Sequence, residues 1–289
     1  MCIASERNLL IFVKCYMNKR MISRIRTLSI LNFIAFVLAF LVSNLSQWGL
    51  LGLNNTMATV SAKYESVFTP AGITFAIWGI IYISLFGFCI YHLFQAFTQH
   101  ADQRVNQDVY KMGWLFVINN AATILWVHSW LSEMLFFSVL LMFIQLFSLL
   151  FVHIRLELFN PRRALLGKAF SQFPLSIYFA WICVATVANT SAYLVSIGWD
   201  ACGISPENWA IIMIGVVTLI SLFMIFIRKN PFFGMVILWA FYGIILKRRQ
   251  IDADLYADVI LAARSAFILI AISTILQLIK NFRSRPRLH

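Results

Sequence analysis

The sequence predicts an all-α protein, a polytopic bundle of about eight transmembrane helices. Of its 289 residues, 61% are hydrophobic and only 12% are charged, whereas soluble domains are roughly 25% charged. The mean hydropathy is +0.83. Apolar stretches of roughly 20 residues recur along the chain, and each can cross a bilayer as a helix because a helix satisfies its own backbone hydrogen bonds. The lipid bilayer is therefore the first expected partner.

The chain starts with a basic segment, residues 1–27. Its apolar run at 11–13 is too short to cross a membrane, and no small-residue cleavage site follows it, so it does not resemble a signal peptide. A basic arm of this kind can lie on anionic lipid. Whether translation begins at Met1, Met17 or Met21 stays open.

Eight helices are expected, at 28–50, 71–97, 111–130, 134–156, 170–198, 209–228, 232–246 and 256–280, followed by a basic cytoplasmic tail at 281–289. The seventh is short for a span unless it continues to 247–249, where long basic side chains can reach the interface. No linker separates two domains, and the similarity between 72–78 and 176–182 is no more than chance produces in so apolar a chain. One helical bundle is the economical prediction.

The net charge of +12 favours an orientation in the membrane, not a nucleic-acid partner, because the basic residues gather at helix ends. The basic residues before the first helix, between the second and third, the fourth and fifth, and the sixth and seventh helices, and after the last helix fall on one side. This places both termini in the cytoplasm of a multi-pass protein, as in a bacterial inner membrane. The cluster at 247–249 is the exception, and it leaves open a re-entrant seventh helix.

The second helix opens with FTPAGITFAIWGIIY at 68–82. Pro70 suits the first turn of a helix. Gly72 and Gly79 share a face that a neighbouring helix can approach, and pairing of two chains through such faces would give a homodimer. Trp78 and Tyr82 lie one turn apart and form an aromatic patch inside the span.

Two further helices carry polar and aromatic stripes at helical spacing. The fifth has Tyr178, Trp181, Ala185 and Asn189 on one face, and the third has Asn119, Thr123, Trp126 and Trp130 on one face. Polar side chains at membrane depth prefer the bundle interior. Such stripes either hold helices together or line a pocket for a flat hydrophobic ligand, with the amide and phenol groups orienting it.

These motifs resemble the TspO or translocator-protein family, also called tryptophan-rich sensory proteins. The resemblance rests on Y-x-x-W-x-x-x-A-T-x-x-N at 178–189 and on the proline, tryptophan and tyrosine of 70–82, and it covers residues 28–198. The chain departs from the family where Ile177 replaces a proline, where Ala122 or Thr123 replaces a tryptophan, and in the first loop, which lacks tryptophan. Three further helices follow at 199–280.

The resemblance implies a longer, divergent relative with a TspO-like five-helix core. Such a protein would be a membrane receptor or carrier for a porphyrin-like or sterol-like small molecule, for sensing or transport, with no resident cofactor. By position, the residues that the resemblance assigns to the ligand cavity are Trp78, Tyr82, Asn119, Trp126, Tyr178, Trp181 and Asn189.

Two alternative functions stay open. A secondary transporter could use all eight helices, although few paired charges lie within them. A membrane-embedded enzyme acting on tetrapyrrole or lipid would need an activated residue, but no nucleophile elbow, phosphate loop or zinc motif is present, and the five cysteines lack metal-ligand spacing. No catalytic residue and no metal ligand is therefore assigned.

Arg264 is the one charge placed well inside an expected span, about 8 Å from its start at 1.5 Å per residue. Its long side chain can reach the interface. Alternatively it faces inward as a counter-ion to a ligand carboxylate or to Glu133, since an isolated arginine at the membrane centre costs at least ~2.5 kcal/mol.

Overall fold

The computed structural model describes residues 2–49, 52, 55–98, 100, 103–158 and 164–283. Within them it contains helices and no strand, so the predicted all-α bundle is confirmed. Seven helices are long and apolar enough to span a membrane, and an eighth apolar helix is shorter. The elements are α1 Cys2–Gln47, α2 Met57–Lys63, η1 Gly72–Ala76, α3 Ile77–Thr98, α4 Arg104–Met112, α5 Leu115–Leu131, α6 Leu135–Leu156, α7 Leu165–Gly167, η2 Lys168–Gln172, α8 Phe173–Ser196, η3 Ala201–Gly203, α9 Pro206–Leu222, η4 Phe223–Ile227, α10 Pro231–Ile251 and α11 Ala257–Arg283.

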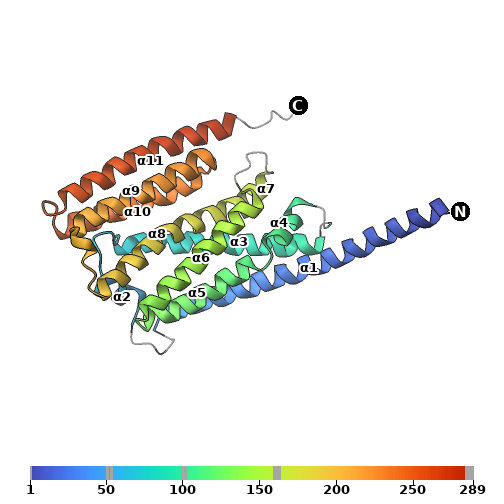
Figure 1. Ribbon diagram of the computed structural model, residues 1–289, viewed down its shortest axis with the longest axis horizontal. Helices are drawn as coiled ribbons and strands as arrows, with labels where there is room; N and C mark the ends of the chain where they lie inside the picture. Colours follow the sequence, from blue (N-terminus) through green and yellow to red (C-terminus); the bar gives the residue numbers. More distant parts are fainter. Residues whose placement is uncertain are drawn as a thin grey trace.

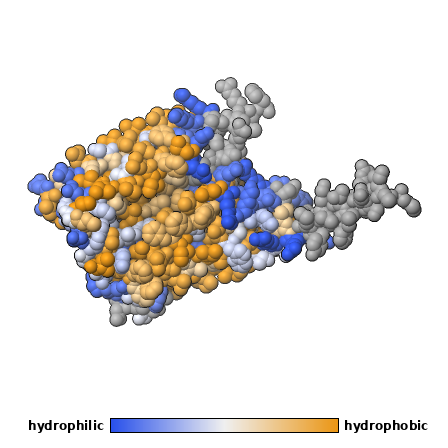
Figure 2. Space-filling model, in the orientation of Figure 1, coloured by the Kyte–Doolittle hydropathy of each residue, from blue (hydrophilic) through white to orange (hydrophobic). Residues whose placement is uncertain are grey.

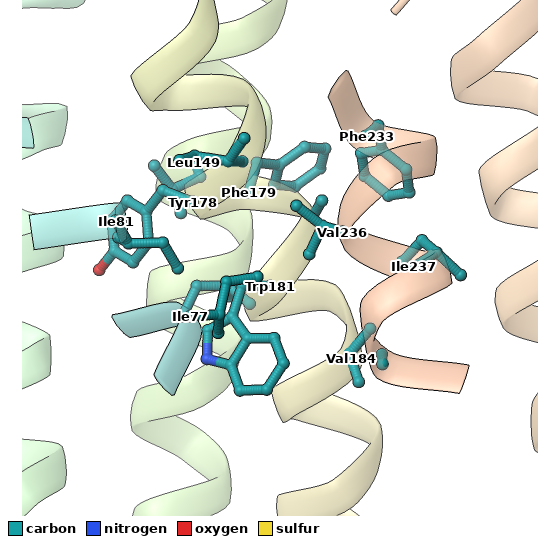
Figure 3. Packing of buried hydrophobic residues seen from close by; sticks show 14 of the residues in the cluster. Ile77, Ile81, Leu149, Tyr178, Phe179, Trp181, Val184, Phe233, Val236 and Ile237 are labelled. Atoms are coloured by element: carbon teal, nitrogen blue, oxygen red, sulfur yellow. The ribbon is translucent and has the colours of Figure 1, made fainter. Parts of the chain in front are cut away.

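Five helices form a closed ring. α1 packs against α3, α3 against α8, α8 against α6, α6 against α5, and α5 returns to α1 (Figure 1). α10 packs on the outer side of α8 and carries α11, which in turn packs on α9. Figure 3 shows the seam between the two layers, where Phe179 of α8 meets Phe233 of α10 with ring centroids 5.9 Å apart. The bundle is thus a five-helix ring with a three-helix layer on one side.

An apolar belt surrounds the bundle. Figure 2 shows hydrophobic residues over its middle and hydrophilic residues toward the end that carries both chain termini. This end is called the terminal end below. Large apolar side chains such as Ile83, Leu219 and Leu261 are exposed on this belt. A soluble monomer rarely exposes so continuous an apolar surface. The chain is therefore an integral, multi-pass membrane protein.

Several helix bounds differ from those predicted. α1 begins at Cys2 instead of residue 28 and continues straight through the basic segment, with its candidate span at Lys19–Ser46. α2 and α4 are short helices that the hydropathy pattern did not predict. α10 continues to Ile251 and has 21 residues, so the seventh predicted helix is long enough to span, which favours a full span over the re-entrant alternative. Residues 284–289 of the basic tail lie outside the described residues.

The basic cluster at the opposite end is partly neutralised. Glu65, between α2 and η1, forms ion pairs with Lys247 and Arg248 of α10. These pairings explain why basic residues occur on a side that otherwise has few of them, because a paired charge contributes less to orientation than a free one.

α10 also holds the start of α3 at close range. The backbone N–H of Ala71 donates to the carbonyl oxygen of Gly243 at 3.0 Å, and Trp239 Nε1 donates to the carbonyl oxygen of Thr74 at 2.8 Å. A Cβ atom added to Gly243 would clash with Thr74 Oγ1. The outer layer is thus joined directly to η1, which borders the interior of the ring.

Candidate ligand-binding cavity

The five-helix ring encloses a cavity of about 1000 Å³. Its walls come from α1, α2, η1, α3, α5, α6 and α8, and one lining residue, Lys247, comes from α10. Small-molecule sites typically measure ~300 to 1000 Å³ and are mostly apolar with a few polar groups. The cavity therefore has the size of a small-molecule binding site.

Aromatic rings form much of the wall. The Trp78 ring stacks on Tyr82 with centroids 5.3 Å apart and meets the edge of Trp181 at 6.3 Å. Phe40 packs edge-on to Tyr82 at 5.2 Å. On the α5 side, Trp126 and a further lining residue, Trp130, are stacked at 6.1 Å. These rigid faces favour a flat apolar ligand, because aromatic groups gain most from offset stacking and edge contacts.

Asn189 supplies a polar group with a defined orientation. Its Oδ1 accepts hydrogen bonds from Trp126 Nε1 at 3.1 Å and from Ser138 Oγ at 2.8 Å. An indole N–H can only donate, so the oxygen of the amide must face Trp126. The Nδ2 group then lies on the other side, buried and without a protein partner.

Trp181 supplies a second unused donor. The side chain is only 2% exposed, and its Nε1 has no hydrogen-bond partner. Figure 3 shows the indole below Tyr178 on α8, beside Ile77 of α3. A buried donor left unpaired costs about 1–3 kcal/mol. A ligand that presents an acceptor to Trp181 or Asn189 would recover part of that energy.

A buried polar network supports the wall from behind. Tyr178 donates from its hydroxyl to Asn119 Oδ1 at 2.8 Å, and Asn119 Nδ2 donates to Ser148 Oγ at 2.9 Å. Thr123 Oγ1 donates to Gln145 Oε1 at 3.0 Å, and these two residues do line the cavity. The network links α5, α6 and α8, so it fixes the positions of the helices that carry Trp126 and Trp181.

The cavity is open on one flank. Several of its lining residues are themselves exposed, and these belong to α1, α2 and α3, as with Leu41, Ala58, Gly79 and Ile83. The opening lies largely on the apolar belt, since α1 and α3 are candidate spans. An apolar molecule dissolved in the bilayer therefore has a route to the aromatic wall.

α2 covers the cavity at the end of the bundle that lies away from the chain termini (Figure 1). Thr56 caps this helix by accepting from the backbone N–H of Thr59. Glu133, in the turn between α5 and α6, accepts from Tyr64 Oη at 2.6 Å and pairs with Lys63. The bond to Lys63 is the main reason that the pKa of Glu133 is lowered, and the bond to Glu133 is the main reason that the pKa of Lys63 is raised.

The structure brings five of the seven expected cavity residues together around this space: Trp78, Tyr82, Trp126, Trp181 and Asn189. Asn119 and Tyr178 are not in the wall but in the network behind it. Arg264 is exposed on α11 and is not a lining residue, so its position does not support a counter-ion role, and Glu133 pairs with Lys63 instead.

Gly72 and Gly79, which were expected to contact a neighbouring helix, line the cavity instead. A Cβ atom added to Gly72 or Gly79 would meet nothing within 4 Å, and both residues line the cavity. Farther along α3, a Cβ atom added to Gly87 would contact the ring of Phe170 at 3.4 Å. Gly72 and Gly79 thus leave space for the cavity and, within this chain, do not bring two helices together.

The sequence reasoning missed Gln145, Ser138, Trp130 and Lys247 as parts of the site. Gln145 had a usable signal, because it is an amide in the middle of an otherwise apolar α6, and such residues turn inward. Lys247 had none, since it is 182 positions from Glu65 and approaches it only through the packing of α10.

A family model described as TSPO-like protein matches residues 29–276. The chain belongs to this family. The match covers the ring and continues past residue 198 through α9, α10 and most of α11, so the second layer of this TSPO-like protein also falls within the matched range. Neither a comparison with curated proteins nor one with solved structures gives a significant match.

Proposed function

We propose that this TSPO-like protein is a membrane receptor or carrier that binds a flat hydrophobic small molecule, porphyrin-like or sterol-like, inside the five-helix ring. The observation that supports this most is the combination of an aromatic wall with two lining residues, Trp181 and Asn189, whose Nε1 and Nδ2 donors are buried and unpaired. Family membership is consistent with it.

In this proposal the ligand enters from the bilayer through the flank opening and lies against Trp78 and Trp181. Ring contacts supply most of the binding energy, and the two donors set the orientation of the ligand. The donors lie eight residues apart on α8, about 12 Å along the helix axis, so they can hold acceptors at two ends of an extended molecule.

We propose that the cavity binds its ligand without turnover. Within the described residues, no group of three His, Cys, Asp or Glu side chains could hold a metal ion. The charged residues of the cavity lining that the structure describes are Glu65 and Lys247, which pair with each other. A bound ligand therefore serves sensing or transport, and counterflow in proteoliposomes distinguishes these, because a receptor gives no accumulation.

The placement in the membrane is part of the proposal. Basic residues at the terminal end favour cytoplasmic termini in a bacterial inner membrane. Pairing of two chains stays a prediction, to be tested by the mass of the detergent-solubilised protein.

The test is a titration of tryptophan fluorescence with protoporphyrin IX in the dark. Binding in the cavity should quench emission, and Trp181→Phe should weaken affinity about tenfold, because it removes the indole donor and part of the wall. Trp114→Phe is the matched control, since Trp114 is exposed and does not line the cavity. Equal affinities for wild type and Trp181→Phe would count against this site.

A further inference from the structure

An ion-pair cluster with a surplus of positive charge lies at the end of the cavity covered by α2. One carboxylate, that of Glu65, serves two cations: its Oε1 pairs with Arg248 and its Oε2 pairs with Lys247 at 3.1 Å. One negative and two positive charges leave one positive charge unbalanced. The pairs lie at the cavity itself, because both Glu65 and Lys247 line it.

The two cations are not equivalent. Arg248 has a side chain only 2% exposed, it lies 4.9 Å from the centre of the Tyr256 ring, and its guanidinium cannot lose its charge. A buried cation needs its anion, so Glu65 is committed to Arg248. The Lys247 side chain is 30% exposed and more loosely held, which makes it the partner that Glu65 can release.

The backbone fixes where Lys247 stands. It lies four residues, one helical turn, after Gly243, whose carbonyl oxygen accepts the N–H of Ala71. That contact seats α10 against Ala71 and Gly72, at the border of the cavity. Lys247 therefore borders the cavity because of a packing contact between α10 and the start of η1, and not through a flexible loop.

We infer that Lys247 binds an acidic group of the ligand at this end of the cavity, so that the ligand is an amphipathic acid with a flat apolar body. The inference rests on the proposed function and narrows its substrate class. The apolar body lies among the aromatic rings of the membrane-embedded part, while the carboxylate stays near water, where its desolvation costs least. Arg249, exposed and outside the lining, takes no part.

The experiment compares protoporphyrin IX, which carries two propionates, with its dimethyl ester, which has the same macrocycle and no charge. The wild-type protein should bind the diacid about five- to tenfold more tightly, the low end for a charge-assisted contact because Lys247 keeps some solvent exposure. Added salt should narrow the difference. Lys247→Gln should abolish the preference, Lys247→Arg should keep most of it, and the control Arg249→Gln should leave it unchanged.

An equal preference in wild type and Lys247→Gln would overturn the role of Lys247. Equal weakening of both probes in Lys247→Gln would show that Lys247 only supports Glu65 structurally, which also overturns it. Failure of the wild-type protein to bind either probe would overturn the proposed function and this inference with it, whereas tight binding of the ester alone would overturn only the inference.

Discussion

Asn189 shows how one side chain determines what the cavity offers a ligand. Because Trp126 and Ser138 both donate to its oxygen, the amide cannot flip, and its nitrogen is the group left for a ligand. Two residues of the cavity lining, Asn189 and Trp181, therefore carry buried donors with no protein partner, and a ligand of the proposed kind would satisfy them with acceptor oxygens at its edges.

Replacing Asn189 with leucine should destabilise the protein by about 2 kcal/mol, because it leaves the Trp126 indole and the Ser138 hydroxyl without their buried acceptor. Thermal unfolding in detergent, followed by tryptophan fluorescence, measures this. Thr186→Val on the same helix is the control, since the Thr186 hydroxyl bonds only the backbone oxygen of Ile182 and its loss should change little. Similar losses in both variants would contradict the orientation assigned to Asn189.

The contact between α2 and Glu133 should depend on pH. The pKa of Glu133 is lowered from its ordinary value of 4.5, so the contact contributes stability above pH 4.5 and loses it as the pH falls through the lowered pKa. The pKa of Lys63 is raised from 10.5, so its contribution is present below 10.5 and is lost as the pH rises through the raised pKa.

Hydrogen exchange of the α2 amides tests this pH dependence. After correction for intrinsic exchange rates, wild-type protection should be higher at pH 7 than below pH 4.5, whereas Glu133→Gln should show reduced protection at pH 7 and little further change in acid. A variant that keeps the wild-type acid profile would show that another group controls the α2 contact.

At the residue scale, the sequence was informative where polar side chains repeat at helical spacing. The stripe of α8 does face the ring interior, and Trp78 does stack on Tyr82. Spacing alone does not show whether an inward residue reaches the cavity or a neighbouring helix. Asn119 and Tyr178 turn toward each other because their hydrogen bond satisfies both groups without a ligand.

Among the elements, α3 shapes the cavity through a position that has no side chain, Gly79. Gly79 is exposed, lines the cavity, and has no atom within 4 Å of an added Cβ. Most residue types at this position would project into the flank opening between α1 and α3. The glycine thus keeps the opening wide enough for a flat molecule.

Gly79→Leu should lower porphyrin affinity at least tenfold without impairing folding, because the new side chain fills the opening and displaces no existing contact. Gly215→Leu on α9 is the matched control: that position is also exposed, also free of contacts, and outside the cavity. Titrations with the porphyrin measure the affinities of both variants. Equal affinities of Gly79→Leu and Gly215→Leu would contradict access through this flank.

The seven long apolar helices and the shorter apolar α5 could be predicted because an apolar run of this length indicates a span. α2 and α4 could not, since a short helix with polar residues has no clear hydropathy signal. The end of α10 was placed too early because Lys247, Arg248 and Arg249 mark an interface in hydropathy. In the structure Lys247 and Arg248 pair with Glu65, and the helix continues to Ile251.

For the whole molecule, the arrangement of a ring with an added layer could not be deduced from the sequence. Contacts such as that between Trp239 and Thr74 join segments 165 positions apart, and no local pattern encodes them. They place one residue from outside the five helices of the ring, Lys247 of α10, in the lining of the cavity.

The orientation of the molecule is open to a direct test. Cys202 is an exposed free thiol in η3, at the end opposite the termini. With the other four cysteines replaced by alanine, a membrane-impermeant maleimide should label Cys202 in intact cells, and should label a Lys280→Cys thiol in an otherwise cysteine-free chain only after permeabilisation. The reverse pattern would place the termini outside.

Protection of a thiol inside the cavity tests the central claim most directly. In an otherwise cysteine-free chain in detergent, Gly79→Cys is labelled with N-ethylmaleimide with and without saturating protoporphyrin IX, and Gly215→Cys serves as the reference on α9. We predict that the porphyrin slows labelling at position 79 at least fivefold and leaves position 215 unchanged. Unchanged labelling at both positions, with the porphyrin demonstrably bound, would show that the ligand lies outside the ring.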